Sequence, residues 1–230
     1  MQMIILFILA VAPGIFLVYQ IYRQDKVEKE PVGLLLLLVL SGVLLIIPVL
    51  IVENLGTLIL NALVPEGVLY SLLDAFVVIA LVEEAGKFLI LKKISWKEKD
   101  FNFTFDGIVY AVCASMGFAI IENILYVFSN GIGTALMRAA LSIPGHAVFA
   151  VYMGLYYGRA KLCEVFLGGK GIKFNFALSI CIPVFLHGLY DFCAMSENTL
   201  LLLFFFVFII VLYAATFINL KTYSKNDQWL

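Results

Sequence analysis

Long runs of apolar residues with few charges dominate the chain, and they predict a bundle of membrane-spanning helices. A helix needs about 20 consecutive apolar residues to cross the hydrocarbon core of a bilayer. Seven stretches meet this requirement: Met3–Tyr22, Val32–Val52, Leu69–Leu91, Thr104–Phe128, Thr134–Gly158, Phe176–Met195 and Thr199–Leu220. We therefore predict an all-α polytopic membrane protein in which residues 1–230 form a single integral membrane domain.

One further apolar segment, Leu55–Val64, is too short to cross the bilayer. We expect it to lie in the interface or to re-enter the membrane on the outer side, between the second and third spans. A role as a gate for the substrate is our hypothesis for this segment.

Basic residues orient the predicted bundle. Thirteen of the 15 lie in the connections after the first, third, fifth and seventh spans: Arg23, Lys26, Lys29, Lys92, Lys93, Lys97, Lys99, Arg159, Lys161, Lys170, Lys173, Lys221 and Lys225. Because positive charge stays on the cytoplasmic side, the N-terminus is predicted outside and the C-terminus inside. The first span lacks a positively charged leader, so we interpret it as an uncleaved anchor rather than a signal peptide.

The composition supports a membrane protein and excludes other classes. Hydrophobic residues make up 63% of the chain and charged residues 13%, whereas soluble domains have about 45–50% and about 25%. This excludes a soluble globule, a disordered protein and a disulfide scaffold. A net charge of −1 gives no general attraction to nucleic acid. The four cysteines have no metal-like spacing and are interpreted as structural.

Several charged or titratable residues lie within or near the apolar spans, where burying a charge has a high free-energy cost. A charged side chain at the centre of a membrane helix costs about 2.5–3.5 kcal/mol, so such residues usually face a cavity and have a function. Six of them lie on four spans at similar depths, near the membrane centre or in its outer half: Glu83, Glu84, Glu122, His146, His187 and Asp191. We predict that they surround one wet cavity reachable from outside. Asp74, Asp106 and Arg138 lie near span ends and are interpreted as structural.

Helical spacing groups the candidate site residues further. Glu83 and Lys87 are four residues apart and can form an ion pair on one helix face. Glu122 follows Phe118 by four residues, with Asn123 beside it. His146 comes directly after a Pro-Gly pair, where a helix can kink, and His187 precedes Asp191 by four. A purely structural alternative, in which these groups only bridge helices, stays open.

Neighbouring carboxylates with histidines nearby suit the activation of water. A glutamate can take the proton from water as a general base, and His187 can stabilise the oxyanion of a tetrahedral intermediate. Asp191 can then hold the tautomer of that imidazole. These parts predict amide hydrolysis inside the membrane. Carboxylates and imidazoles also bind divalent metals such as zinc, although the H-E-x-x-H zinc motif is absent.

The third to sixth predicted spans resemble the PrsW-type intramembrane proteases, which are grouped with CAAX prenyl endopeptidases and bacteriocin-immunity membrane proteases. Four motifs carry the resemblance, in family order: Glu83-Glu84-Ala85-Gly86-Lys87, Phe118-Ala119-Ile120-Ile121-Glu122-Asn123, Pro144-Gly145-His146-Ala147 followed by Gly154, and His187-Gly188-Leu189-Tyr190-Asp191. The remaining spans are similar only in being hydrophobic.

The resemblance implies a multi-pass protease of the bacterial plasma membrane. Its substrate would be a single-pass membrane-anchored anti-sigma factor, and a first (site-1) cut would lead to release of an extracytoplasmic-function sigma factor under envelope stress. Carried over residue by residue, it makes Glu83 or Glu84 the base and assigns the oxyanion or orienting role to His187 with Asp191. CAAX enzymes typically have histidine where Glu122 stands and an arginine one residue beyond Lys87. Two alternatives therefore stay open: water is activated by a Glu–Glu pair, or Glu122 is a metal ligand.

Two other classes of function compete with the protease. Membrane-embedded acids and histidines also relay protons or cations in transporters, often within inverted repeats. No repeat is visible in this sequence, which disfavours a proton- or cation-coupled transporter. A non-catalytic membrane partner, such as an immunity or scaffold protein, is the third alternative.

Overall fold

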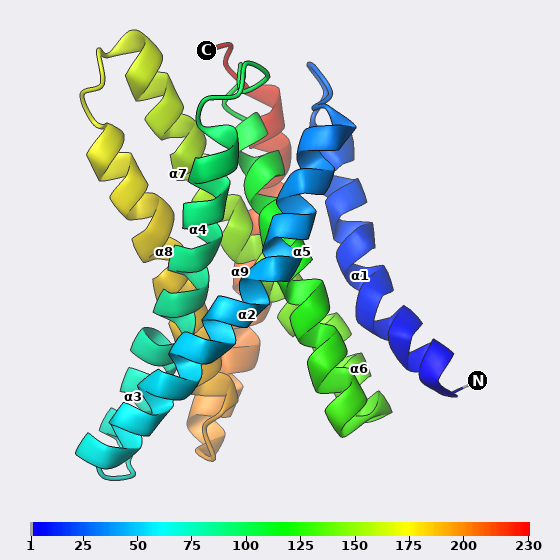
Figure 1. The fold of residues 1–230 in the computed structure, drawn as a ribbon, viewed down its shortest axis with the longest axis vertical. Coiled ribbons are helices and arrows are strands. Elements are labelled where there is room, and N and C mark those ends of the chain that lie inside the picture. Colours follow the sequence, from blue (N-terminus) through cyan, green and yellow to red (C-terminus); the bar gives the residue numbers. More distant parts are fainter. Residues whose placement is uncertain (1) are drawn as a thin grey trace.

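A computed structural model describes residues 2–230, and in that part of the chain the regular structure is helical. The elements are α1 (Gln2–Gln24), α2 (Val32–Leu63), α3 (Val68–Leu73), the π-helix η1 (Asp74–Ala80), α4 (Leu81–Ser95), α5 (Asp106–Asn130), α6 (Ile132–Ala140), α7 (Ser142–Phe166), α8 (Ile172–Ala194) and α9 (Thr199–Lys225). The rods run up and down through one bundle (Figure 1). The predicted all-α fold is confirmed.

Six helices of the described part are long and apolar enough to cross a membrane. The third predicted span corresponds to α3, η1 and α4, which follow one another without a break. The basic connections after α1, α4 and α7 lie at the end of the bundle that holds the C-terminus (Figure 1). A count of seven crossings and the orientation of the bundle stay predictions.

Helix α2 differs from its prediction at the C-terminal end. It continues past Val52 to Leu63, so residues 55–63 are its last turns rather than a separate segment. Asn54, which lies between the predicted span and the short apolar segment, is accommodated within the helix, because its side chain donates a hydrogen bond to the carbonyl of Leu50 at 2.6 Å. At about 48 Å for 32 residues, α2 is longer than the hydrocarbon core of a bilayer. A gating role for this end of α2 stays a prediction.

The predicted fifth span is two helices. Helix α6 ends at Ala140, the helix is interrupted at Leu141, and α7 continues to Phe166. Proline lacks an N–H and therefore belongs in the first turn of a helix, where Pro144 now lies. The hydroxyl of Tyr213 donates to the carbonyl of Leu141 at 2.5 Å and satisfies it at the break.

Helix α5 is the centre of the bundle and packs against α1, α2 and α7 (Figure 1). Glycines let α5 and α7 approach closely, since a Cβ added at Gly107 would lie 2.8 Å from the carbonyl oxygen of Gly154. This is the way membrane helices gain packing contacts when lipid removes the hydrophobic driving force between them. The central position of α5 places its residues next to several other helices at once.

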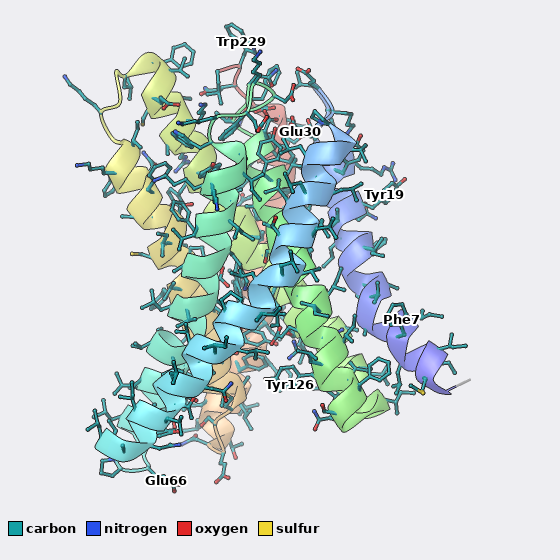
Figure 2. All side chains as sticks on the ribbon, in the orientation of Figure 1. Phe7, Tyr19, Glu30, Glu66, Tyr126 and Trp229 are labelled. Atoms are coloured by element: carbon teal, nitrogen blue, oxygen red, sulfur yellow. The ribbon has the colours of Figure 1, made fainter. Side chains whose placement is uncertain are left out.

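The outer surface of the bundle is apolar, whereas its ends are polar. Figure 2 shows Phe7 and Tyr19 pointing outward from α1, Glu30 and Trp229 at the end that holds the C-terminus, and Glu66 at the opposite end. Phe7 and Tyr19 are exposed, as side chains facing lipid should be. The distribution of side chains thus agrees with a multi-pass membrane protein.

Replacing Gly154 by leucine should loosen the bundle. The added side chain has no room against the backbone of α5, and overpacking of this kind costs about 1–3 kcal/mol. We expect a fall in the thermal unfolding temperature of the purified protein in detergent. Gly33→Leu is the matched control, because nothing lies within 4 Å of a Cβ there. Equal stability of the two variants would contradict the close approach of α5 and α7.

Candidate active site

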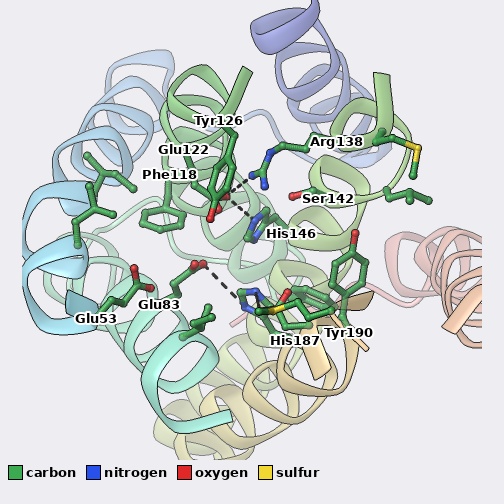
Figure 3. Close-up of a pocket in the computed structure, with 18 residues that line it drawn as sticks. Glu53, Glu83, Phe118, Glu122, Tyr126, Arg138, Ser142, His146, His187 and Tyr190 are labelled. Atoms are coloured by element: carbon green, nitrogen blue, oxygen red, sulfur yellow. Dashed lines mark hydrogen bonds and ion pairs between the residues drawn. The ribbon is translucent and has the colours of Figure 1, made fainter. Parts of the chain in front are cut away.

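A cavity of about 330 Å³ opens between the helices in one half of the bundle. Its charged and imidazole lining comes from α2, α4, α5, α6, α7 and α8 and comprises Glu53, Glu83, Glu122, Arg138, His146, His187 and Asp191. Figure 3 shows Glu122, Arg138 and His146 on one side of this cavity and Glu83 and His187 on the other. Six helices thus contribute charge or an imidazole to one space.

Lys87 organises the paired glutamates on α4. Its Nζ lies 2.8 Å from Glu83 Oε2 and 2.8 Å from Glu84 Oε1, on the same helix. The ammonium also lies 4.5 Å from the centre of the Phe118 ring, a cation–π distance. Lys87 and Glu84 are fully buried, while Glu83 faces the cavity. A single cation thus contacts two buried carboxylates from behind the cavity wall.

His146 bridges Lys87 and Glu122. Its Nδ1 lies 3.3 Å from Lys87 Nζ, and its Nε2 lies 3.0 Å from Glu122 Oε2. Because Nδ1 faces an ammonium donor, it accepts, and Nε2 donates its proton to the carboxylate. Arg138 donates to the same Glu122 oxygen at 2.7 Å and, through Nε, to Asn123 Oδ1 at 2.9 Å. The orientation of His146 is thus held by a network of charged groups.

His187 lies between two carboxylates. Its Nδ1 is 3.0 Å from Glu84 Oε1, and its Nε2 is 3.2 Å from Asp191 Oδ2, one turn further along α8. The imidazolium form satisfies both contacts, since both partners only accept. The ring stacks on Phe149, with 5.0 Å between the ring centres, and lies 5.2 Å from the ring of His146. Both histidines of the chain therefore meet at this site.

The donor set fits a divalent metal ion. Glu83, Glu84, His146 and His187 offer ligand atoms that all lie within 4.8 Å of one another. Each histidine turns Nδ1 toward the glutamates and Lys87, while a carboxylate holds its Nε2; metal-binding histidines are usually oriented in this way. Glu84 Oε2 is buried without a partner. The ammonium of Lys87 contacts one oxygen of each glutamate and also His146 Nδ1. A metal would therefore use the second oxygen of each glutamate and would take the place of this ammonium at His146.

The structure brings together all of the residues that the sequence predicts for the site: Glu83, Glu84, Glu122, His146, His187 and Asp191, with Lys87, Phe118 and Asn123 in contact with them. Glu84, however, does not line the cavity. Glu122 contacts Arg138 and His146 and lies outside the four-residue donor set.

The three charged residues near predicted span ends differ in their surroundings. Arg138 lines the cavity and is bonded to Glu122, with its side chain 15% exposed. Asp106 is only 1% exposed and lies at the other end of α5. Asp74 begins η1 and lies outside the cavity lining. The interpretation of these three residues as structural stays a prediction.

Glu53 is a cavity residue that sequence reasoning did not single out. It follows the predicted end of the second span, where a carboxylate is ordinary. Because α2 continues, the side chain of Glu53 lines the cavity instead, and its Oε1 is buried without a partner. The only signal in the sequence was one acid within a long apolar run.

Comparisons with known proteins identify the family of this chain. The family described as "PrsW family intramembrane metalloprotease" matches residues 30–216. Protease PrsW of Geobacillus kaustophilus is 36% identical over 189 residues, covering 82% of this chain and 79% of its own. Protease PrsW of Clostridioides difficile is 35% identical over 228 residues, covering 97% and 93%. No solved structure matches this chain.

A helical membrane bundle with an acid–histidine cavity, similar to proteases along most of its length, is an intramembrane protease. More particularly, the chain belongs to the PrsW family, and it is a multi-pass protein of a bacterial membrane. The family places it among enzymes, so the alternatives of a transporter and of a non-catalytic partner are not retained.

Replacing Lys87 by methionine should destabilise the protein strongly. The change leaves Glu83 and Glu84 buried without their cation, and breaking a buried ion pair from one side costs about 3–5 kcal/mol. The thermal unfolding temperature of the purified protein in detergent should fall by on the order of 10 °C. Lys173→Met, at an exposed position, is the control. An unfolding temperature equal to that of the parent would contradict the role of Lys87 as the counterion.

Proposed function

We propose that this chain makes the first (site-1) cut in a single-pass membrane-anchored anti-sigma factor, leading to release of an extracytoplasmic-function sigma factor. Its membership of a family of intramembrane proteases supports the proposal. The observation that carries it is the meeting of Glu83, His146 and His187 at one cavity. A substrate helix that unwinds next to this cavity would expose a peptide bond to groups able to activate water.

Glu83 is our candidate for the general base. It lines the cavity, whereas Glu84 does not. Lys87 holds Glu83 Oε2 at 2.8 Å, so that Glu83 Oε1 is the oxygen left to accept a proton from water. Glu84 serves the site differently, because its Oε1 contacts both Lys87 and His187 and holds them in place. The two glutamates thus act as a pair: Glu83 accepts the proton, and Glu84 holds Lys87 and His187 in position.

His187 is our candidate for stabilising the oxyanion. It lines the cavity, and both of its ring nitrogens face carboxylates. The N–H that faces Asp191 makes the longer of the two bonds, at 3.2 Å, and is the donor that a developing oxyanion can share. Asp191 and Glu84 fix the ring between them. A preformed cationic donor in a site shielded from water stabilises developing negative charge more than the uncharged substrate.

In the alternative, metal-dependent mechanism, a divalent metal such as zinc would be held by Glu83, Glu84, His146 and His187. Glu83 and a neutral His187 would then be ligands rather than the general base and the cationic donor. Such an ion would supply a Lewis acid next to the scissile carbonyl and the attacking water. The chain's own contribution is to orient both histidines through Glu122 and Asp191. Arg138 neutralises Glu122, which keeps that carboxylate available to His146.

Glu83→Gln should abolish cleavage, because the amide keeps the shape of the side chain but cannot take a proton. Loss of a general base lowers the rate by about 10²–10⁴-fold. The measurement is cleavage of a single-pass anti-sigma factor substrate reconstituted with the purified protein in liposomes. Glu164→Gln, at an exposed position remote from the cavity lining, is the matched control and should cut normally.

The anti-sigma substrate and the base are tested separately in that experiment. Cutting by Glu83→Gln at the parental rate, with equal amounts of protein, would remove Glu83 as the base. If the parent cuts other single-pass proteins but not the anti-sigma factor, the chain is a protease whose substrate we assigned wrongly.

The metal content of the active protein distinguishes a metal-dependent mechanism from one in which Glu83 activates water without a metal. We expect about one transition-metal ion such as zinc per chain by elemental analysis of the active protein, and we expect a zinc chelator to abolish cleavage until zinc is returned. A His146→Ala/His187→Ala variant should lose the ion, because two of the four proposed ligands are gone. Full activity of a preparation without stoichiometric metal would contradict a metal mechanism and favour Glu83 acting without one.

A further inference from the structure

Three segments that are distant in sequence meet at the end of the bundle that holds the C-terminus (Figure 2). They are the α1–α2 connection, the α4–α5 connection and the segment after α9. The amide of Thr104 donates to the carbonyl of Gln228 at 3.0 Å, and the amide of Leu230 to the carbonyl of Asn102 at 2.7 Å. Asn102 Nδ2 donates to Glu28 Oε2 at 3.0 Å. Backbone and side-chain bonds thus tie this end together.

Three carboxylates are buried beneath these connections. Asp25 and Glu30 come from the α1–α2 connection and Asp106 from the first turn of α5; they are 2%, 3% and 1% exposed. Each offers an oxygen, and these oxygens lie within 4.8 Å of one another. None of the three is in an ion pair with a lysine or arginine of the described chain. Like charges so close together in a buried place repel unless something positive lies between them.

Two oxygens of the cluster have no hydrogen-bond partner, namely Asp25 Oδ2 and Asp106 Oδ1. The donors nearby are already used elsewhere. The amides of Asn102 and Phe103 donate to the other oxygen of Asp106, at 3.1 and 2.7 Å, and the hydroxyl of Tyr110 donates to Glu30. A buried carboxylate oxygen without a partner in the protein is costly, so two such oxygens in a cluster of three carboxylates favour the binding of a cation at this place.

We propose that Asp25, Glu30 and Asp106 bind a divalent cation with a preference for oxygen ligands, Mg²⁺ or Ca²⁺. Carboxylate oxygens are the ligands that both ions prefer. The position is separate from the active site, since Asp106 lies 16 residues before Glu122 on α5, about 24 Å along the helix. A cation here would fasten the α1–α2 connection to the first turn of α5, the helix that also carries Glu122.

The protonation behaviour of the cluster is consistent with this assignment. Burial and, to a smaller extent, the neighbouring Asp227 and Glu28 raise the pKa of Asp25 to about 6 against the opposing effect of Lys29. Burial also raises the pKa of Glu30. Lys29 itself bonds the backbone carbonyls of Tyr22 and Asp25, so it does not supply an ion pair to the carboxylates. The charged forms are therefore disfavoured without an added cation.

Cation binding to the whole purified protein in detergent tests the proposal. After treatment with a chelator, Mg²⁺ or Ca²⁺ should raise the thermal unfolding temperature by about 5–10 °C at saturation. Tb³⁺, an oxygen-preferring probe ion, should show luminescence sensitised by Tyr110, whose hydroxyl contacts Glu30. Displacement of Tb³⁺ by Ca²⁺ but not by Mg²⁺ would identify Ca²⁺, and displacement by Mg²⁺ at millimolar levels would identify Mg²⁺.

Asp25→Asn and Glu30→Gln each remove one charged ligand without changing its size. Either should weaken Tb³⁺ binding by at least about tenfold and remove the rise in unfolding temperature. Without a cation, both variants should be at least as stable as the parent, because repulsion is relieved, and this shows that they fold. Glu28→Gln is the matched control in the same connection, since its glutamine oxygen can still accept from Asn102.

Two results would overturn the proposal. One is a parent protein that neither binds Tb³⁺ nor gains stability with Mg²⁺ or Ca²⁺, which would mean that protons alone relieve the repulsion. The other is an equal gain in the parent, Asp25→Asn and Glu30→Gln, which would place the bound cation elsewhere. Neither readout uses proteolysis, so the outcome is independent of the proposed catalytic roles.

Discussion

Glu83 and Glu84 lie inside a membrane bundle. The ammonium of Lys87, 2.8 Å from each of them, offsets the free-energy cost of burying their charges. In such surroundings a charge must be balanced by another group of the protein, because neither water nor lipid can do so. Each further carboxylate in contact with the two histidines obeys the same constraint. Glu122 lies beside Arg138, and Asp191 beside His187. The site is therefore a network of alternating charges, in which every group depends on the helices that carry its neighbours.

This dependence explains why the helices around the cavity are irregular. The π-helix η1 directly precedes the helix that carries Glu83, and the rod of α6 and α7 breaks at Leu141, shortly before His146. Extra residues in a helical turn re-aim the side chains that follow, and π-helical turns are frequent at functional sites. Helix α8 approaches η1 closely at Gly188, where an added Cβ would lie 2.5 Å from the ring of Phe76. The irregular turns and this small residue bring His187 next to the glutamates.

The two ends of α5 illustrate opposite solutions to the same electrostatic problem. Around Glu122 the protein supplies its own cation, Arg138, and an oriented imidazole, His146. Around Asp106 it buries three acids with two oxygens left unsatisfied and with no basic side chain paired to them in the described chain. The first arrangement leaves a carboxylate and a histidine facing a cavity, as hydrolysis needs. The second ties loops together and depends on a ligand from solution.

Much of the candidate site could be predicted because a charge in an apolar helix carries such a high free-energy cost that charged residues in these spans stand out. Glu83, Glu84, Glu122, His146, His187 and Asp191 were found in this way, and their helical spacing paired Glu83 with Lys87. For the converse reason, Glu53, Asp25 and Glu30 were not singled out. Arg138 and Asp106 were interpreted as structural. A charge near the end of an apolar run, or in a connection, is ordinary in a sequence, and nothing local reveals that folding will bury it.

The sequence by itself determined that the chain is an all-α membrane protein and which side chains could not face lipid, because both follow from the cost of placing polar groups in hydrocarbon. Only the tertiary structure decided which partner balances each charge, that Glu83 rather than Glu84 faces the cavity, and that α2 continues past Glu53. These features depend on how one helix is rotated and packed against another. Contacts between residues far apart in the chain set that packing, and the periodicity of a single helix does not contain them.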